Sequence, residues 1–235
     1  MSTKDKCRSL TYDGRMEPDP FADPAPDTAQ TAAEEATGPS RRDRKKLQTR
    51  DELIVQAARL FDAHGFDAVT TEQIAEAADV SQRTFFRHFS SKESVLYADT
   101  DMLRKRMRIA FDARPANEAI TLSVTHAMMA ITNDYPDDRD LRYLQARLGS
   151  TSPALSAYAR AVVQASWEHE LTTAIAERLG VDPLEDAHPE VLAGAAFSAL
   201  RAATRQWFAH DGHGDLPEVL RRALGAIARL DVRAA

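Results

Sequence analysis

The sequence predicts an all-α protein, in which a three-helix unit near the N-terminus precedes a larger helical region. Three observations support this fold class. Apolar residues recur at helical spacing, prolines fall at the breaks between the periodic segments, and no segment shows the alternating pattern of a strand. Hydrophobic residues make up 43% of the 235 residues and charged residues 28%, ordinary proportions for a globular chain. No apolar run approaches the ~20 residues that a membrane-spanning helix needs, so no membrane partner is expected.

Residues 1–40 are expected to form a disordered N-terminal tail. Large apolar side chains are few in this segment, so burial could not offset the entropy lost on ordering it. Its prolines are Pro18, Pro20, Pro24, Pro26 and Pro39. Met1 and Met16 stay open as alternative translation starts. The single cysteine, Cys7, excludes an internal disulfide and a cysteine-rich zinc site, and a cytoplasmic location is expected.

Basic residues gather at one point of an otherwise acidic chain. The formal net charge is −6, but residues 41–92 carry ten Lys/Arg and eight Asp/Glu, a balance of +2. Most of the excess comes from a basic run at Arg41, Arg42, Arg44, Lys45 and Lys46. A basic patch on an acidic protein is compatible with DNA binding, because phosphate contacts act over about one Debye length. Two interpretations stay open: an arm on the DNA backbone or minor groove, or the solvated start of a helix.

Three helices with a tight turn between the last two are expected after this run. Apolar spacing predicts a first helix around 53–61, which Gly65 ends because glycine tolerates a positive φ. Thr70 and Gln73 fit a capping box at the start of the second helix. An Asp-Val-Ser turn then leads into a third helix at 82–89. This order is the helix-turn-helix pattern, whose second helix enters the major groove of DNA.

The stretch from residue 53 to residue 96 closely resembles the TetR (tetracycline repressor) family of regulators. The residues that carry the resemblance are AHGF at 63–66, TTEQIA at 70–75, DVS at 79–81, TFFRHF at 84–89 and SKE at 91–93. The resemblance implies a helix-turn-helix DNA-binding domain at 41–96, followed by a helical ligand-sensing and dimerisation domain at 97–235.

The resemblance also implies roles for individual side chains. Gln82, Arg83 and Thr84 fall on the exposed first turn of the recognition helix and would read base edges. Arg83 would pair with guanine through two hydrogen bonds, and Gln82 with adenine. The positions implied to contact the DNA backbone are Thr70, Phe86, Arg87, His88 and Lys92.

Two residues depart from the family pattern. Phe86 stands where many relatives have a tyrosine whose hydroxyl donates to phosphate, so it can only pack on a sugar or a thymine methyl. Arg87 is expected to supply the phosphate contact instead. Asp79 stands where a turn glycine is frequent. Aspartate tolerates the left-handed conformation better than most residues, so we expect the turn to survive.

Only helices are expected beyond residue 90. The expected spans are 91–112, 116–133, 138–149, 153–180, 188–210 and 216–231. In the TetR family the last two helices of each subunit form a four-helix dimer interface, so the resemblance implies a homodimer. Intrachain packing of their small and apolar residues is the alternative. A dimer would place two recognition helices one DNA turn, ~34 Å, apart on a palindrome.

A cavity among these helices is the expected sensor for an unknown small molecule. Its candidate lining residues are His126, Met129, Tyr143, Tyr158, Trp167 and His169. Ordinary core packing is the alternative for each of them. The His-Asp-Gly-His segment at 210–213 is interpreted as a polar loop, and no catalytic or phosphate-binding motif occurs. We therefore expect no metal, no cofactor and no enzyme activity.

These expectations combine into a homodimeric repressor that a small molecule releases from a palindromic, double-stranded DNA operator. An activator with the same architecture is the nearest alternative. A second alternative is an all-helical interaction protein whose three-helix unit only packs, without sequence-specific DNA binding. An enzyme would require His126 and His169 to gather with acidic residues in one cavity.

Overall fold

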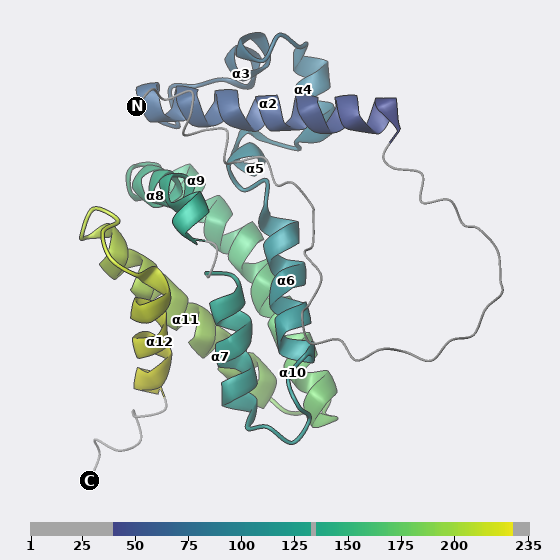
Figure 1. Cartoon of the computed structure of the whole chain (residues 1–235), viewed down its shortest axis with the longest axis vertical. Helices are drawn as coiled ribbons and strands as arrows, with labels where there is room; N and C mark the ends of the chain where they lie inside the picture. The colour runs from purple at the N-terminus through teal and green to yellow at the C-terminus, as the bar shows by residue number, and fades with distance from the viewer. Residues whose placement is uncertain (1–39, 133–134, 228–235) are drawn as a thin grey trace, which may run out of the picture.

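The computed structural model describes residues 40–132 and 135–227, so the tail expected at residues 1–40 lies outside the described residues except for Ser40. Every regular element in this part of the chain is a helix, which confirms the all-α fold class. Figure 1 shows a small group, α2 to α5, above a larger bundle formed by α6 to α12. Within the described residues, no helix combines the length and the apolarity that a bilayer span requires.

The small group contains four helices. Their bounds are α2 Arg41–His64, α3 Thr71–Ala77, α4 Gln82–His88 and α5 Lys92–Leu96. Helix α2 ends at Gly65, whose φ of 79° favours glycine. The capping box expected for α3 is confirmed: Thr70 Oγ1 accepts a hydrogen bond from Gln73 N at 3.2 Å, and Gln73 Oε1 accepts one from Thr70 N at 2.8 Å.

The turn between α3 and α4 sets the direction in which α4 leaves. Asp79 has a φ of 54°, the left-handed conformation expected at this position. Val80 N donates to Ala75 O at 2.9 Å, which closes the turn. Ser81 then caps α4, because its Oγ accepts from Thr84 N at 3.2 Å. Local chemistry therefore defines both ends of the turn.

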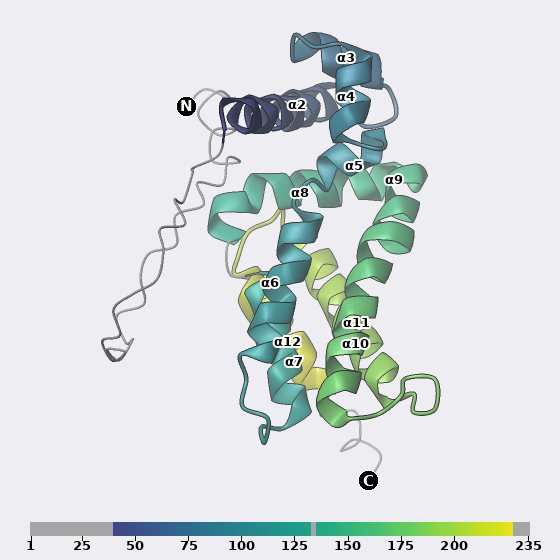
Figure 2. The same ribbon diagram turned by 90° about the vertical axis from the view of Figure 1, so that its right-hand side faces the viewer.

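One apolar core holds the small group together and extends beyond it. Fully buried at its centre are Leu53, Phe61, Ile74 and Phe85. The same core includes Leu144, Leu148 and Leu155, which come from α8 (Tyr135–Thr151) and α9 (Pro153–Tyr158). Figure 2 shows α8 lying crosswise between α5 and the bundle. The helix-turn-helix unit therefore shares its apolar core with α8 and α9 and packs directly on the larger bundle.

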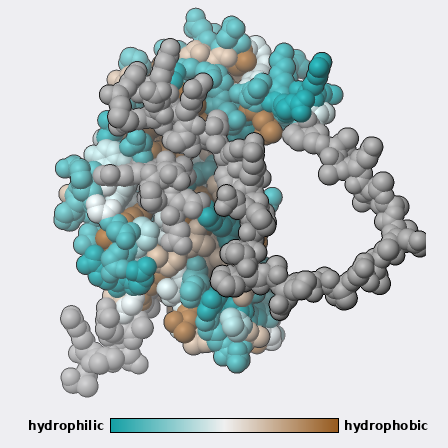
Figure 3. Space-filling view, in the orientation of Figure 1, coloured by the Kyte–Doolittle hydropathy of each residue, from teal (hydrophilic) through white to brown (hydrophobic). Residues whose placement is uncertain are grey.

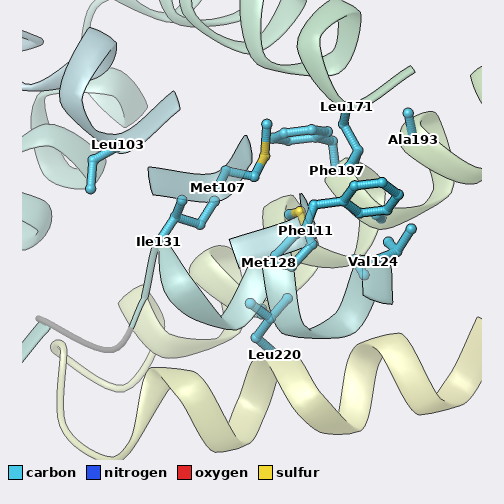
Figure 4. Close-up of a cluster of buried hydrophobic side chains, with 14 of the residues drawn as sticks. Leu103, Met107, Phe111, Val124, Met128, Ile131, Leu171, Ala193, Phe197 and Leu220 are labelled. Atoms are coloured by element: carbon cyan, nitrogen blue, oxygen red, sulfur yellow. The ribbon is translucent and has the colours of Figure 1, made fainter. Parts of the chain in front are cut away.

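The larger bundle has a second core. Its other elements are α6 Thr100–Asp112, α7 Ile120–Ala130, the π-helical segment η2 Ala159–Gln164, α10 Ala165–Leu179, α11 His188–Phe208 and α12 Leu216–Ile227. Met107, Phe111, Met128 and Phe197 are 2% exposed or less and meet where α6, α7 and α11 converge (Figure 4). The two cores determine which faces of the helices are buried and which are exposed to solvent.

The helix expected at 91–112 is interrupted between α5 and α6, at a point where side chains of α8 contact the chain. The chain leaves α5 after Leu96 and starts α6 at Thr100. Gln145 Nε2 donates to Leu96 O at 2.7 Å, and Arg142 forms an ion pair with Asp99. Gln145 thus satisfies a backbone carbonyl that the break leaves without a helical partner, and the Arg142–Asp99 pair joins α8 to the residue before α6. The expected span 153–180 is likewise divided, into α9, η2 and α10.

The apolar side of α12 is used inside the chain. Leu216 and Leu220 are 1% and 0% exposed, and both belong to the core of the larger bundle. Val219 and Leu224 pack against the same core. The intrachain alternative considered above therefore accounts for these residues, and a dimer interface would have to use the outer faces of α11 and α12.

Gly212 provides a test of this packing. Its φ is +67°, and an added Cβ would lie 2.8 Å from Tyr143 Cδ2 and 3.1 Å from Trp207 Cζ2. We expect Gly212→Ala to lower the free energy of unfolding by at least ~2 kcal/mol, from overpacking and backbone strain together. Gly214→Ala is the matched control, because Gly214 also has a positive φ but has no atom within 4 Å of the added Cβ. Equal losses for the two variants in urea unfolding would contradict the contact.

Candidate nucleic-acid interface and effector cavity

Helix α4 is divided between a buried face and an exposed face. Phe85 is 0% and Phe89 5% exposed, and their ring centroids lie 5.7 Å apart. Residues 82, 83, 86 and 87 are exposed on the other side. The apolar anchors thus decide which side chains α4 presents to solvent. Figure 3 shows mostly hydrophilic residues over the top of the molecule, where α2 to α4 lie.

The first turn of α4 contains the three expected base readers, and their surroundings differ. Gln82 Nε2 donates to Thr71 Oγ1 at 3.0 Å. Thr84 Oγ1 lies 3.0 Å from Ser81 Oγ, within the cap of the helix. The guanidinium of Arg83 is exposed and has no hydrogen bond or ion pair with any described residue. Of the three, Arg83 can reach a base edge without giving up an intramolecular partner.

Two of the expected phosphate contacts already have partners inside the chain. Thr70 is engaged with Gln73 through its backbone N and its hydroxyl. Lys92 Nζ donates to Phe66 O and to Val69 O, both at 2.8 Å, and lies 4.3 Å from the centre of the Phe66 ring. Lys92 therefore ties the loop after α2 to the start of α5. An ammonium group has three donors, so one N–H remains for a phosphate oxygen.

The C-terminal half of α4 presents an apolar and a cationic side chain together. Phe86 is 52% exposed and packs edge-on against Phe85, with 5.4 Å between the ring centroids. Arg87 beside it is exposed and stands in the last turn of the helix. An exposed ring next to a guanidinium matches a surface that meets both sugar and phosphate.

His88 is surrounded by positively charged side chains. Its Nε2 is buried and has no hydrogen-bond partner among the described residues. Burial, together with the positive charges of Arg87, Lys46 and Arg50, lowers the pKa of His88 below its usual value. The imidazole is therefore neutral at pH 7 and would gain a proton most easily when an anion approaches.

The basic run is helical. Residues 41–46 form the first turns of α2 and are exposed. Ser40 caps them, since its Oγ accepts from Asp43 N at 3.2 Å. Figure 1 shows this end of α2 projecting past α4. For the conformation of the run, the solvated start of a helix is thus the correct interpretation, and contact with DNA stays a prediction.

A cavity of about 540 Å³ lies in the larger bundle. Its walls come from α6, α8, η2, α10 and α11, and one edge is formed by Tyr97, Asp99 and Thr100 at the break between α5 and α6. Its volume falls in the range of ~300–1,000 Å³ typical of small-molecule sites. The π-helical segment η2 supplies four lining residues, and such segments occur often at functional sites.

Of the six expected lining residues, only Trp167 lines this cavity. Tyr143 packs on Phe208 with 5.4 Å between ring centroids, and Tyr158 stacks on Tyr97 at 6.0 Å, so both stand behind the wall. Met129 packs against the core of the bundle. His126 and His169 are exposed on the outside of α7 and α10 and do not gather in the cavity.

Sequence reasoning missed the polar residues of the cavity. They include Asp99, Arg142, Gln145, Arg160, Arg201 and Arg205. Arg142 and Gln145 stand three residues apart on α8 and are both 8% exposed, between the core leucines of that helix. Polar residues on a face that otherwise packs inward are the one signal that could have drawn attention to this helix.

Two family models match successive parts of the chain. A family model described as bacterial regulatory proteins, tetR family, matches residues 53–98, and one described as the MftR C-terminal domain matches residues 118–230. The chain is 36% identical over 178 residues to the HTH-type transcriptional regulator TcmR of Streptomyces glaucescens, which covers 73% of this chain and 78% of TcmR. It is 25% identical over 189 residues to a Mycobacterium tuberculosis protein named as a mycofactocin biosynthesis regulator, MftR, covering 80% and 93%.

Solved structures show the same fold at low sequence identity. The fatty acid degradation regulator FadR from Bacillus halodurans superposes with a TM-score of 0.55 at 16% identity, over 74% of this chain and 95% of its own. The regulator SmeT, solved as a triclosan complex, superposes with a TM-score of 0.54 at 17% identity, over 76% and 91%. Both TM-scores indicate that the helices of this chain are arranged as in these two structures.

The lowered pKa of His88 predicts a dependence of stability on pH. Below pH ~6.5 the unfolded chain binds a proton at this residue that the folded chain binds less readily, so stability falls as the pH drops. We expect the free energy of unfolding to fall less between pH 7.5 and pH 5.5 in His88→Gln than in the wild type. Urea unfolding at both pH values measures this. His169→Gln, exposed on α10, is the control for replacing a histidine, and an equal fall in His88→Gln and the wild type would contradict the effect.

Proposed function

The chain belongs to the tetR family of bacterial regulatory proteins and is thus a DNA-binding transcriptional regulator, and from this premise we propose that it is a homodimeric repressor, released from a palindromic operator by a small molecule. One observation supports DNA reading most directly. Phe85 is buried while Arg83, two residues before it, is exposed and has no partner among the described residues. Such a regulator acts on chromosomal DNA, so we assign it to the cytoplasm.

In this proposal the first turn of α4 reads the bases. Arg83 donates two hydrogen bonds to guanine, a contact that discriminates against a wrong base by ~1–3 kcal/mol. Gln82 exchanges its bond to Thr71 for an adenine edge, so its net contribution is smaller. Thr84 contributes its methyl group and its hydroxyl at the edge of the same turn.

The surrounding side chains hold the DNA backbone in this proposal. Phe86 packs on a sugar, and Arg87 and His88 face the phosphates next to it. Thr70 and the third N–H of Lys92 engage phosphates on the side of α3. The basic arm adds Arg41, Arg42, Arg44, Lys45 and Lys46, whose contacts carry no sequence information but increase affinity for any DNA.

The proposed dimer uses the outer face of α11. Ser198 and Ala202 are exposed there, one turn apart, and Val191 is 64% exposed on the same helix. Small residues allow two helices to approach closely, and an apolar residue left in solvent gains from burial. Two copies joined there and along the outer face of α12 would present two copies of α4 to successive major grooves.

We propose that the ligand releases the protein from DNA by acting on the break between α5 and α6. The Gln145–Leu96 hydrogen bond and the Arg142–Asp99 ion pair join α8 to this break, and Tyr97, Asp99, Arg142 and Gln145 also line the cavity. A ligand that moves α8 therefore acts on residues next to the helix-turn-helix unit. The shift in DNA affinity equals the ligand's preference between the two arrangements.

Replacing Arg83 tests base reading. In DNA that the protein selects from a random-sequence pool, Arg83→Ala is expected to lose ~1–3 kcal/mol of affinity for the selected site, because a bidentate guanine contact is removed. Arg44→Ala is the matched control, since it removes an equal charge from the arm. It is expected to weaken binding to selected and scrambled DNA alike and to reduce the salt slope by about one. Affinities at fixed salt measure both, and an equal loss on both DNAs for Arg83→Ala would remove it as a base reader.

Replacing Asp99 tests the connection to the cavity. Asp99→Asn keeps the size of the side chain but removes the carboxylate that pairs with the largely buried guanidinium of Arg142. We expect a loss of about 3 kcal/mol in stability, the low end for breaking a buried pair, together with weaker operator binding. Asp101→Asn, 85% exposed and two residues away, is the control and should stay within ~0.5 kcal/mol. If the two variants behave alike in urea unfolding and DNA binding, the proposed path is wrong.

A further inference from the structure

We propose that the cavity binds an amphiphile with an anionic head group, an inference that rests on the proposed function and names the ligand class of its effector site. The lining of the cavity is positively charged. Four arginines line the cavity, Arg142, Arg160, Arg201 and Arg205, against one carboxylate, that of Asp99. The lining therefore has a formal charge of +3, four arginines minus one aspartate. Residues 93–235 as a whole carry sixteen Lys/Arg and twenty Asp/Glu, a balance of −4. The cavity is thus cationic within an acidic region.

Most of these arginines have no carboxylate partner among the described residues. Arg142 is the partner of Asp99, so that pair is balanced. Arg160 donates to Ser156 Oγ at 2.6 Å and Arg201 to Ser198 Oγ at 3.0 Å, both neutral acceptors. Neither of these two, nor Arg205, has an ion-pair partner among the described residues. Three guanidinium groups therefore line the cavity without an ion pair to any described carboxylate.

The contact between α6 and α10 provides an internal comparison. Arg104 donates to Glu170 at 2.5 Å, and Arg108 pairs with Glu170, Asp112 and Glu177. These two partly buried arginines thus have carboxylate partners, whereas Arg160, Arg201 and Arg205 are exposed at the cavity and have no ion pair among the described residues. Their charge leaves the cavity open to an anion from outside the chain.

The same lining also has an apolar part. Leu103, Ile131 and Phe197 are 5% exposed or less, and Trp167 and Leu200 stand beside them. Arg201 and Arg205 lie one turn apart on α11, and Arg160 comes from η2, so the cations reach the cavity from two walls. A guanidinium recognises carboxylate and phosphate oxygens through two parallel hydrogen bonds. An apolar body with a carboxylate or phosphate head satisfies both parts of the lining.

The test compares ligands that share a body and differ in head group. Decanoate, decan-1-ol and decyltrimethylammonium, each below its micelle-forming concentration, are titrated into the full chain without DNA by calorimetry. We expect decanoate to bind about tenfold or more tightly than decan-1-ol, and the cation to bind more weakly than either. 2-Naphthoate against 2-naphthol then distinguishes an aromatic body from an aliphatic one, and a preference for the carboxylate in either pair supports the proposal.

Variants connect the preference to named residues. The double variant Arg201→Gln/Arg205→Gln, and separately Arg160→Gln, should reduce the preference for decanoate over decan-1-ol, to about equal affinity in the double variant. Arg221→Gln, exposed on α12 and paired with Glu218, is the matched control and should keep the preference. Melting followed by circular dichroism checks that each variant is folded. Equal binding of carboxylate and alcohol by the wild type in both pairs, an unchanged preference in the double variant, or no binding of either carboxylate would overturn the ligand class.

A separate DNA measurement keeps this inference distinct from the proposed repressor. If decanoate binds through Arg201 and Arg205 but leaves the operator complex intact, the ligand class stands and the release step is overturned. If the operator is bound specifically but the head group makes no difference to ligand affinity, the repressor stands and the ligand class is overturned.

Discussion

The recognition helix α4 is seven residues long, and the burial of Phe85 determines what it can do. Isolated helices shorter than ~12–15 residues are marginal in water, so α4 exists only because its apolar face packs. Burying a phenylalanine side chain stabilises by ~1.5–3 kcal/mol, and Phe89 adds a second anchor one turn later. Once Phe85 and Phe89 face inward, helical geometry turns residues 82, 83, 86 and 87 outward. The surface that we propose to face DNA is thus a consequence of core packing.

The same dependence on packing connects the two ends of the molecule. The core that holds Phe85 also contains Leu144, Leu148 and Leu155, so α8 and α9 support the helix-turn-helix unit directly. Helix α8 reaches the cavity through Arg142 and Gln145, which also satisfy the break after α5. A helix that belongs to the DNA-binding core and to a cavity wall gives a physical basis for coupling, because packed elements shift as units. No separate signalling element is needed.

Sequence reasoning was most successful where local chemistry decides the structure. The Thr70–Gln73 capping box and the left-handed Asp79 both follow from short-range patterns, and the structure confirms both. Long-range contacts decided the rest. The break after Leu96 depends on Gln145, forty-nine residues away. The cavity is defined by arginines on η2 and α11, and a search for apolar and aromatic candidates found only Trp167 because the distinguishing groups are charged.

Methylation interference on DNA that the full chain selects from a random pool tests the central claim that α4 reads the major groove. Guanine N7 lies in that groove, where Arg83 would donate to it. The account predicts that methylating N7 at guanines in two half-sites, about one helical turn apart, abolishes binding, and that Arg83→Ala removes this sensitivity at one guanine of each half-site. Binding that tolerates N7 methylation throughout the site, or that is blocked only by modification in the minor groove, would contradict it.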